Sequence, residues 1–368
     1  MIQLSEEHLT ILDQLIHRNI PFVIYKMPHE NEWHFRMQTQ GDLLQVSSLS
    51  QLNLAKGYII APFHVSDECP ILLLRADCEE IPSKEELVYL TEKSNSVLSE
   101  EMENATQLFE DYGVVFSKFM KPLLDKEVEK LVLSRQQTLS PAEPLSPALS
   151  FLRACNAYPN AYVYLLNTKP TGVWMGSTPE LLLAGNQSEW KTVALAGTQS
   201  NRDSEEVSWD EKNLHEQDLV VQYLKKQLKQ FGVDPEISGP RNIHAGQVMH
   251  LVSQFNFRLE SRDKLGDLLS LLHPTPAVCG TPKEFAYEFI RTHEPKSRKY
   301  YSGFLGELNP NGKTDLFVNL RCMQIQQKTC TLYAGGGLLP SSILEDEWKE
   351  TQNKMLTMQA LLLKDNSN

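Results

Sequence analysis

The sequence predicts an α+β fold in which large antiparallel β-sheets are flanked by helices. Short apolar runs separated by turn residues predict hairpin-like strands. Longer segments with apolar residues every three or four positions predict helices, and these interrupt the hairpins without the regular spacing of βαβ units. A chain of 368 residues is long enough to bury its core without a metal or disulfides.

The first third of the chain begins with a helix and continues with short strands. Residues 1–20 carry Leu and Ile at helical spacing before Pro21, which predicts an amphipathic helix. Apolar runs bounded by turn residues predict strands at 22–25, 33–35 and 57–61. One or two helices are expected over residues 84–119. Their candidate buried positions include Leu87, Leu90 and Leu108.

The rest of the chain alternates strand pairs with long helices. A strand at 130–134 is followed by a proline-punctuated loop at 140–147. Strand pairs are expected between 162–166 and 172–176 and between 315–320 and 331–334. Helices are expected over 209–231, with Gly232 as the C-cap, and from a capping box at Ser342–Glu345 to about residue 363.

The composition excludes several classes of protein. Asp and Glu outnumber Lys and Arg by 47 to 35, and no basic block offsets the net charge of −12. Nucleic acid and anionic membranes are therefore unfavourable partners, whereas local cations or a metal still allow an anionic small molecule. The six cysteines are dispersed, no secretory signal opens the chain, and no apolar run approaches a membrane span. Without heptads, we expect a cytoplasmic monomer with reduced thiols.

Candidate chemistry rests on polar residues in apolar surroundings, because common nucleotide, hydrolase and zinc-protease motifs are absent. Lys130 begins an apolar strand, where it is either a strand-end lysine reaching solvent or a buried base. Glu180 is either the capping-box partner of Ser177 or a general acid. Residues 196–198 and 334–337 are either ordinary turns or places where the backbone approaches a carboxylate. Arg321 either pairs with a surface acid or binds a carboxylate.

Acidic residues on two separate helices form a second candidate site. Glu347, Glu350 and Lys354 lie at i, i+3 and i+7, a spacing typical of a surface salt bridge. Together with Glu216 from another helix, the same acids would supply the oxygen ligands that Mg²⁺ takes. Spacing alone leaves both interpretations open.

Read in order, eight or more blocks of sequence resemble the chorismate-utilising enzymes. The first blocks are Lys130–Arg135, Gly176–Leu182, Ala194–Thr198 and Val248–Leu251. The later blocks are His273–Ala277, Tyr300–Gly303, Asn319–Arg321, Tyr333–Gly337 and Glu347–Thr351 with Lys354. The resemblance covers residues 111–365 as a chorismate-binding catalytic region, whereas residues 1–110 match weakly and look shorter than the family's usual N-terminal part. We expect the two parts to form one compact unit.

The resemblance implies the chorismate-utilising fold and, within the family, an isochorismate synthase for menaquinone or siderophore biosynthesis. Ammonia-adding members carry Gln where this chain has Lys130, and aminodeoxychorismate synthases carry a nucleophilic lysine where it has Ala196. Salicylate-forming members tend to have Thr at the position of Ala277. A salicylate synthase, a non-catalytic chorismate-binding subunit and a synthase coupled to a glutamine amidotransferase are the alternatives, and no amidotransferase partner is expected.

The resemblance also assigns roles to residues. It makes Lys130 the base that activates water for attack at C2 of chorismate, and Glu180 the acid that protonates the departing C4 hydroxyl. It implies Mg²⁺ held by Glu216, Glu350 and, through water, Glu347. The substrate-binding residues that it implies are Gly197, Thr198, His250, Ala277, Tyr301, Arg321, Gly335 and Lys354. Asn213 and Gln217 depart from the family pattern beside the first metal ligand, and this leaves the complete metal shell open.

Overall fold

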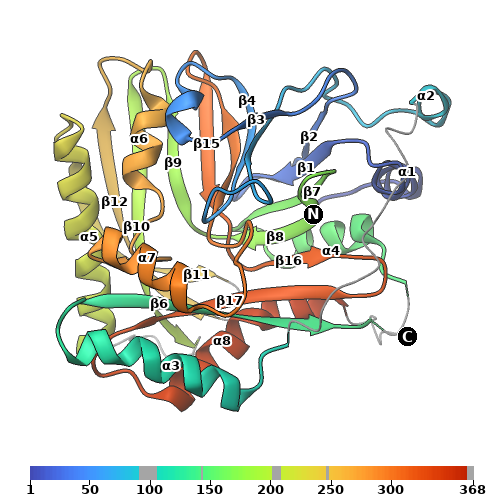
Figure 1. Cartoon of the computed structure of the whole chain (residues 1–368). Coiled ribbons are helices and arrows are strands. Elements are labelled where there is room, and N and C mark those ends of the chain that lie inside the picture. The colour runs from blue at the N-terminus through green and yellow to red at the C-terminus, as the bar shows by residue number, and fades with distance from the viewer. Residues whose placement is uncertain (91–105, 142–143, 201–208, 246–247, 363–368) are drawn as a thin grey trace.

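Two antiparallel β-sheets and the helices around them make up the computed structural model (Figure 1). It describes residues 1–90, 106–141, 144–200, 209–245 and 248–362, with the backbone only at 198–200, 244–245 and 248. Among these residues the first sheet has eight strands in the order β13-β6-β17-β16-β8-β7-β1-β2. The second has nine in the order β11-β12-β10-β9-β15-β14-β4-β5-β3.

The strands have the following bounds. Those of the first sheet are β1 Phe22–Lys26, β2 His34–Met37, β6 Lys130–Leu139, β7 Tyr162–Thr168, β8 Gly172–Thr178, β13 Gly280–Thr281, β16 Cys322–Ile325 and β17 Cys330–Leu338. Those of the second are β3 Leu44–Val46, β4 Gly57–Ala61, β5 Ile71–Leu74, β9 Leu181–Asn186, β10 Glu189–Ser200, β11 Glu236–Ala245, β12 Val248–Arg258, β14 Phe304–Leu308 and β15 Lys313–Val318.

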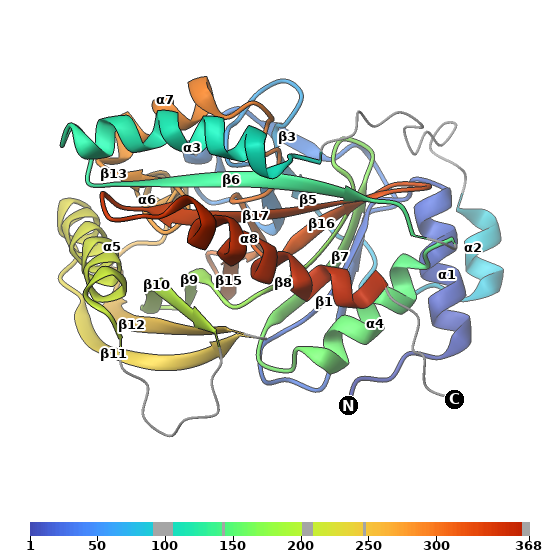
Figure 2. The same cartoon turned by 90° about the horizontal axis from the view of Figure 1, so that it is seen from below.

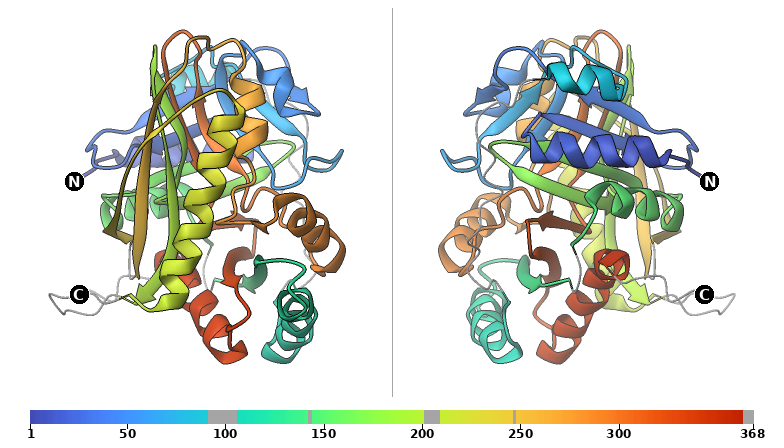
Figure 3. Two further views of the ribbon diagram at one scale, coloured as in Figure 1. Left: turned by 90° about the vertical axis from the view of Figure 1, so that its left-hand side faces the viewer. Right: turned by 90° about the vertical axis from the view of Figure 1, so that its right-hand side faces the viewer.

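Helices cover the outer faces of both sheets. They are α1 Glu6–His17, α2 Lys84–Tyr89, α3 Phe109–Leu124, α4 Pro147–Ala157, α5 Glu211–Gln230, α6 Leu265–Leu272, α7 Lys283–His293 and α8 Leu344–Gln359. The helices α1, α4 and α8 pack on the first sheet, and α5 and α6 pack on the second. Figure 2 shows α3 and α8 on either side of β6 and β17, and both side views in Figure 3 show these two helices together at one end of the molecule.

Aromatic side chains fill the layer between the two sheets. Tyr162 of β7 stacks on Phe317 of β15 with ring centroids 4.2 Å apart. The hydroxyls of Tyr58 and Tyr162 lie 2.7 Å apart and are both buried, so each satisfies the other. This layer joins the sheets through apolar area and neutral hydrogen bonds.

The N-terminal strands are built into both sheets. β1 pairs with β7, with Ile24 opposite Leu165, and β4 pairs with β14, with Ile60 opposite Leu305. The N-terminal strands therefore complete the sheets that carry the later blocks.

Most predicted elements are present, including the first helix, the strands of the N-terminal third and the helix over α5. The strand pair between β7 and β8 is also confirmed, with Leu165 opposite Met175. Gly232 follows α5 with a φ of +87°, the left-handed conformation expected after a helix C-terminus.

Three predictions of local structure are wrong. Residues 315–320 and 331–334 do not pair, because β15 belongs to the second sheet and β17 to the first. Leu108 is 59% exposed, since it precedes the first turn of α3 instead of facing a core. The capping box at the last helix is absent, because Ile343 is the N-cap and makes no side-chain bond there. Residues 91–105, within the predicted helical segment, lie outside the described residues.

Among the described residues, every helix is too short or too polar to span a lipid bilayer.

Candidate active site

The strands β6 and β17, which carry Lys130 and a run of glycines, lie side by side at the centre of the site. Lys130 begins β6 with a side chain that is 0% exposed, so the strand-end interpretation is wrong. β17 lies beside it in register, with Gly337 opposite Val132. A Cβ at Gly337 would lie 3.0 Å from Lys130 Cε and would collide with Glu216 Oε1. Only glycine leaves room for these side chains.

Glu180 lies in the short link between β8 and β9, where no helix begins, so its capping-box interpretation is wrong. The side chain is buried, and its backbone carbonyl accepts a hydrogen bond from Val318. Burial raises the pKa of Glu180 to about 7, although the nearby charge of Lys130 and the hydroxyl of Thr275 act in the opposite direction. A carboxyl group with this pKa carries a proton for part of the time near neutral pH.

Each predicted acidic metal ligand is paired with a lysine. Lys130 Nζ lies 2.8 Å from Glu216 Oε1, and Lys354 Nζ lies 2.5 Å from Glu350 Oε1. The third pair joins Lys212 Nζ to Glu347 Oε1 over 2.6 Å. The three carboxylates therefore come from α5 and α8, and a lysine neutralises each one in this conformation.

The oxygen-rich donor set fits a hard divalent cation such as Mg²⁺. Glu347 is buried, and its Oε2 has no hydrogen-bond partner, which leaves an acceptor open. Burial and the neighbouring Glu350 raise the pKa of Glu347, as expected for acids gathered together. Within the described ranges, no three His, Cys, Asp or Glu side chains are already arranged as a metal-binding group. The oxygen ligands for a cation are thus present, and each carboxylate is paired with a lysine.

Arg321 and His250 form a second polar arrangement. Arg321 Nη2 donates to His250 Nε2 over 3.1 Å, and His250 Nδ1 donates to the carbonyl of Gly197 over 3.0 Å. Burial, with the charge of Arg321, lowers the pKa of His250 to about 3, so the imidazole is neutral and accepts from the arginine. Arg321 Nη1 is buried without a partner, and its φ of +47° is uncommon for a residue other than glycine.

Lys354 and Tyr301 border the same glycine-rich strand. Lys354 Nζ donates to the carbonyl of Gly335 over 2.8 Å. A Cβ at Gly335 would lie 3.0 Å from the hydroxyl of Tyr301, so the ring packs directly on the strand backbone. Gly197 has a φ of +69°, and a Cβ there would lie 3.3 Å from the carbonyl oxygen of Asn213.

One cavity collects most of the predicted residues. Its lining includes Glu180, Gly197, Glu216, His250, Ala277, Tyr301, Arg321, Gly335 and Lys354. Lys130 lies behind Glu216 and Gly337, and neither Glu347 nor Glu350 lines the wall. The side chain of Thr198 lies outside the described residues, and its backbone pairs with His250.

Comparisons with known proteins identify the family of this chain. Residues 58–363 match the family model described as chorismate binding enzyme. The chain belongs to the chorismate-binding enzyme family. Isochorismate synthase EntC of Escherichia coli K12 is 30% identical over 241 residues, which cover 63% of this chain and 62% of that protein. Isochorismate synthase DhbC of Bacillus subtilis is 29% identical over 265 residues, covering 68% and 67%. The match to EntC thus spans less than two thirds of its length.

Solved structures show that this family member has the chorismate-utilising fold. MenF, the menaquinone-specific isochorismate synthase of Escherichia coli, superposes with a TM-score of 0.75 at 24% identity, over 96% of this chain and 91% of that one. The putative 2,3-dihydroxybenzoate-specific isochorismate synthase DhbC of Bacillus anthracis gives 0.75 at 22% identity, over 95% and 99%. The predicted α+β fold is confirmed.

Sequence reasoning missed several residues of this chorismate-binding family site. Lys212 lies four residues before Glu216 on α5, so helical spacing alone places both on one face. Thr275, whose hydroxyl lowers the pKa of Glu180, stands in the His273–Ala277 block. The apolar wall includes Val132, Leu195, Leu320 and Tyr333, which stand in the blocks that carry the resemblance but have no assigned role there.

The two departures from the family pattern have structural roles. Gln217 Oε1 accepts from the backbone N–H of Ala196, and its Nε2 donates to the carbonyl of Ala194 and to Ser253 Oγ. Gln217 therefore ties α5 to β10 and uses its amide there. The side chain of Asn213 donates to Asp210 at the start of α5.

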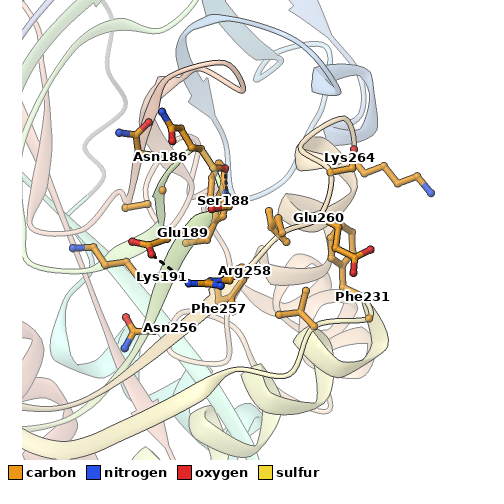
Figure 4. Close-up of a pocket in the computed structure, with 18 of the residues that line it drawn as sticks. Asn186, Ser188, Glu189, Lys191, Phe231, Asn256, Phe257, Arg258, Glu260 and Lys264 are labelled. Carbon is orange, nitrogen blue, oxygen red and sulfur yellow. Dashed lines mark hydrogen bonds and ion pairs between the residues drawn. The ribbon is translucent and has the colours of Figure 1, made fainter.

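A larger and more open hollow lies elsewhere in this family member, along β9, β10 and β12 and the end of α5 (Figure 4). Its rim mixes charges of both signs, including Glu189, Lys191, Arg258 and Glu260. Arg258 and Glu189, which pair between the neighbouring strands β12 and β10, are both about four-fifths exposed. None of the predicted site residues lines this hollow.

Proposed function

We propose that this chorismate-binding family member is an isochorismate synthase, which converts chorismate to isochorismate. The observation that carries the proposal is Glu180, a buried carboxyl with a pKa of about 7 in a cavity that also holds Arg321. The reaction adds water at C2 and removes the hydroxyl at C4, so it needs an acid that is still protonated near neutral pH. Relatives named isochorismate synthases over most of the chain support this choice.

Glu180 is the general acid in this proposal. Its proton goes to the departing C4 hydroxyl, which leaves as water. The burial that raises its pKa keeps the carboxyl group protonated for part of the time near neutral pH. After the reaction the carboxylate lies near Lys130 and Arg321, whose charges stabilise it.

Lys130 is the base that takes a proton from the attacking water. In the present arrangement it is the cationic partner of Glu216, so it has to give up a proton before it can accept one. Glu216 Oε1 lies 2.8 Å from Lys130 Nζ and fixes the position of the lysine beside the cavity. Lysine at this position supports water addition, because the ammonia-adding relatives of the resemblance carry Gln.

Glu216 and Glu350 hold Mg²⁺ in this proposal, with Glu347 acting through water. When bound, the ion supplies positive charge that offsets repulsion between a dianionic substrate and these acids. The open Oε2 of the buried Glu347 supports a role for this carboxylate toward a cation.

The substrate carboxylates have separate partners. Arg321, Tyr301 and Gly335 bind the pyruvyl side chain, and the unpartnered Nη1 of Arg321 supports this assignment. Four residues border the ring carboxylate: Lys354, His250, Gly197 and Thr198. Ala277 lines the cavity and has no polar side-chain group. We propose that this residue suits a site that releases isochorismate and does not convert it to salicylate.

Several broader assignments belong to the same proposal. The isochorismate enters menaquinone or siderophore biosynthesis, and the titles of two similar structures print menaquinone-specific and 2,3-dihydroxybenzoate-specific isochorismate synthases. The protein acts as a cytoplasmic monomer without an amidotransferase subunit. Residues 1–110 and 111–365 form one unit, which the strand pairing of β1 and β4 supports.

The test is to incubate the purified protein with chorismate and Mg²⁺ and to separate the products by chromatography. We expect isochorismate to reach equilibrium with chorismate. Salicylate and pyruvate in equal amounts would replace the proposal with a salicylate synthase. Binding of chorismate without any product would indicate a non-catalytic subunit.

A further inference from the structure

Lys212 occupies a distinctive position beside the carboxylate cluster of Glu216, Glu347 and Glu350. It lies in the first turn of α5, one helical turn before Glu216, and its ammonium reaches across to Glu347 on α8. Its side chain is 28% exposed, whereas that of Glu347 is 1% exposed. Lys212 is therefore a partner that can move out to solvent, while the carboxylate that it neutralises cannot.

Glu347 is only half satisfied by its surroundings. Its Oε1 accepts from both Lys212 Nζ and Ser342 Oγ, over 2.6 and 2.7 Å. Its Oε2 is buried without a partner and faces Gly336, where a Cβ would lie 2.8 Å away. A buried carboxylate oxygen without a partner is unfavourable, and here it points to a ligand that donates or carries positive charge.

The other two acids of the cluster also act on Lys212. Glu350 and Glu216 add their negative charges to that of Glu347 around the Lys212 ammonium. Both acids have lysines of their own, but Lys354 also binds the carbonyl of Gly335 and Lys130 is completely buried. Lys212 is the paired lysine with the greatest access to solvent.

We propose that the Lys212 ammonium is a built-in counter-ion that occupies the carboxylate cluster in the metal-free protein and must leave before a divalent cation binds. The inference rests on the Mg²⁺ role proposed for the cluster and adds the group that competes for it. The two cations exclude each other because a hydrated metal ion beside Glu347 would occupy the side of the carboxylate cluster where the Lys212 ammonium lies, and positive charges repel strongly in a partly buried site. Metal binding therefore exchanges one intramolecular ion pair for coordination.

The first test measures metal binding directly, with Mn²⁺ as a paramagnetic probe and free Mn²⁺ measured by electron paramagnetic resonance. Lys212→Met removes the charge and keeps an unbranched side chain one atom shorter, and Lys225→Met changes an exposed lysine on the same helix as a control. We expect Lys212→Met to bind Mn²⁺ at least fivefold more tightly than the wild-type protein, and Lys225→Met to bind it equally. Unchanged or weaker binding by Lys212→Met would overturn the proposal.

The second test uses the wild-type protein and remains informative even if Lys212→Met does not fold. Brief acetylation with and without saturating Mg²⁺, read by peptide mass spectrometry, should show Lys212 several-fold more reactive with the metal and Lys225 unchanged. Equal labelling of Lys212 in both conditions would overturn the proposal. Failure of the wild-type protein to bind Mn²⁺ at all would instead overturn the metal site itself, so the two failures are distinguishable.

Discussion

Two buried polar regions of this protein differ in the charge of their groups and in how their polar atoms are paired. Between the sheets, the hydroxyls of Tyr58 and Tyr162 satisfy each other and carry no charge. In and beside the active-site cavity, burial is accompanied by full charges, and polar atoms such as Arg321 Nη1 and Glu347 Oε2 have no partner. Neutral pairs complete a core by themselves, whereas unsatisfied charged groups require something further to bind. The comparison separates the part of the molecule that holds the sheets together from the part that performs chemistry.

Removal of the proposed acid should have the largest effect. We expect Glu180→Gln to lower the rate of isochorismate formation about 10²–10⁴-fold, because the amide has no proton to give to the C4 hydroxyl. The amide is nearly isosteric, so the melting temperature should not fall. Chromatographic rates and a thermal melt measure both effects. Retention of most of the activity by Glu180→Gln would contradict the role of Glu180 as the general acid. The cavity would then differ from the neutral layer only in its charges.

Filling the space beside Lys130 should have the next largest effect. In Gly337→Ala, the added methyl group collides with Glu216 Oε1 and forces the Lys130–Glu216 pair apart. We expect activity to fall by about 10²-fold and stability by about 1–3 kcal/mol, as for overpacked sites. Gly113→Ala, in α3, is the matched control, since there the nearest atom to a Cβ is a flexible leucine methyl group 3.3 Å away. Equal activity of the two variants would contradict the account of this strand.

The raised pKa of Glu180 predicts a dependence on pH. Above the pKa of about 7 the acid loses its proton, so kcat/KM should fall about tenfold per pH unit. Because its folded pKa lies above the ordinary value of 4.5, protonated Glu180 favours the folded state at low pH, and this contribution disappears as the pH rises towards 7. The loss is about 3 kcal/mol.

Urea unfolding of the wild-type protein and of Glu180→Gln at pH 5 and pH 8 measures this contribution. The stability difference between the two proteins should change with pH. A constant difference would mean that Glu180 is not the titrating group.

A substitution in the neutral layer between the sheets should lower stability and leave activity unchanged, and this effect should be the smallest. Tyr58→Phe leaves the hydroxyl of Tyr162 buried without its partner, so we expect a loss of about 1–3 kcal/mol in unfolding free energy and unchanged activity. Tyr89→Phe, at an 84% exposed tyrosine, is the control and should change neither quantity. Loss of activity in Tyr58→Phe at temperatures where it is folded would remove the distinction between the two regions.

Local patterns predicted the elements but not where the chain changes sheet. The strands β7 and β8 follow from apolar runs joined by a short turn, and their pairing was predicted. The expected pair of 315–320 with 331–334 was wrong because the chain leaves the second sheet after Val318 and enters the first at Cys322. Arg321, in the link, has a left-handed backbone, and its carbonyl accepts from the N–H of Ser177. No spacing of apolar residues encodes such a crossing.

The sequence by itself determined the fold class, the types of residue at the site and the order in which they occur. Periodicity and residue identity are local properties, and the ordered blocks carry the family resemblance. Only the tertiary structure decided which groups meet and how they ionise. Lys212 and Glu347 are 135 residues apart in the chain, and nothing near either one predicts their ion pair. The pKa of Glu180 likewise depends on burial and on charges from other elements, which exist only once the sheets and helices have packed.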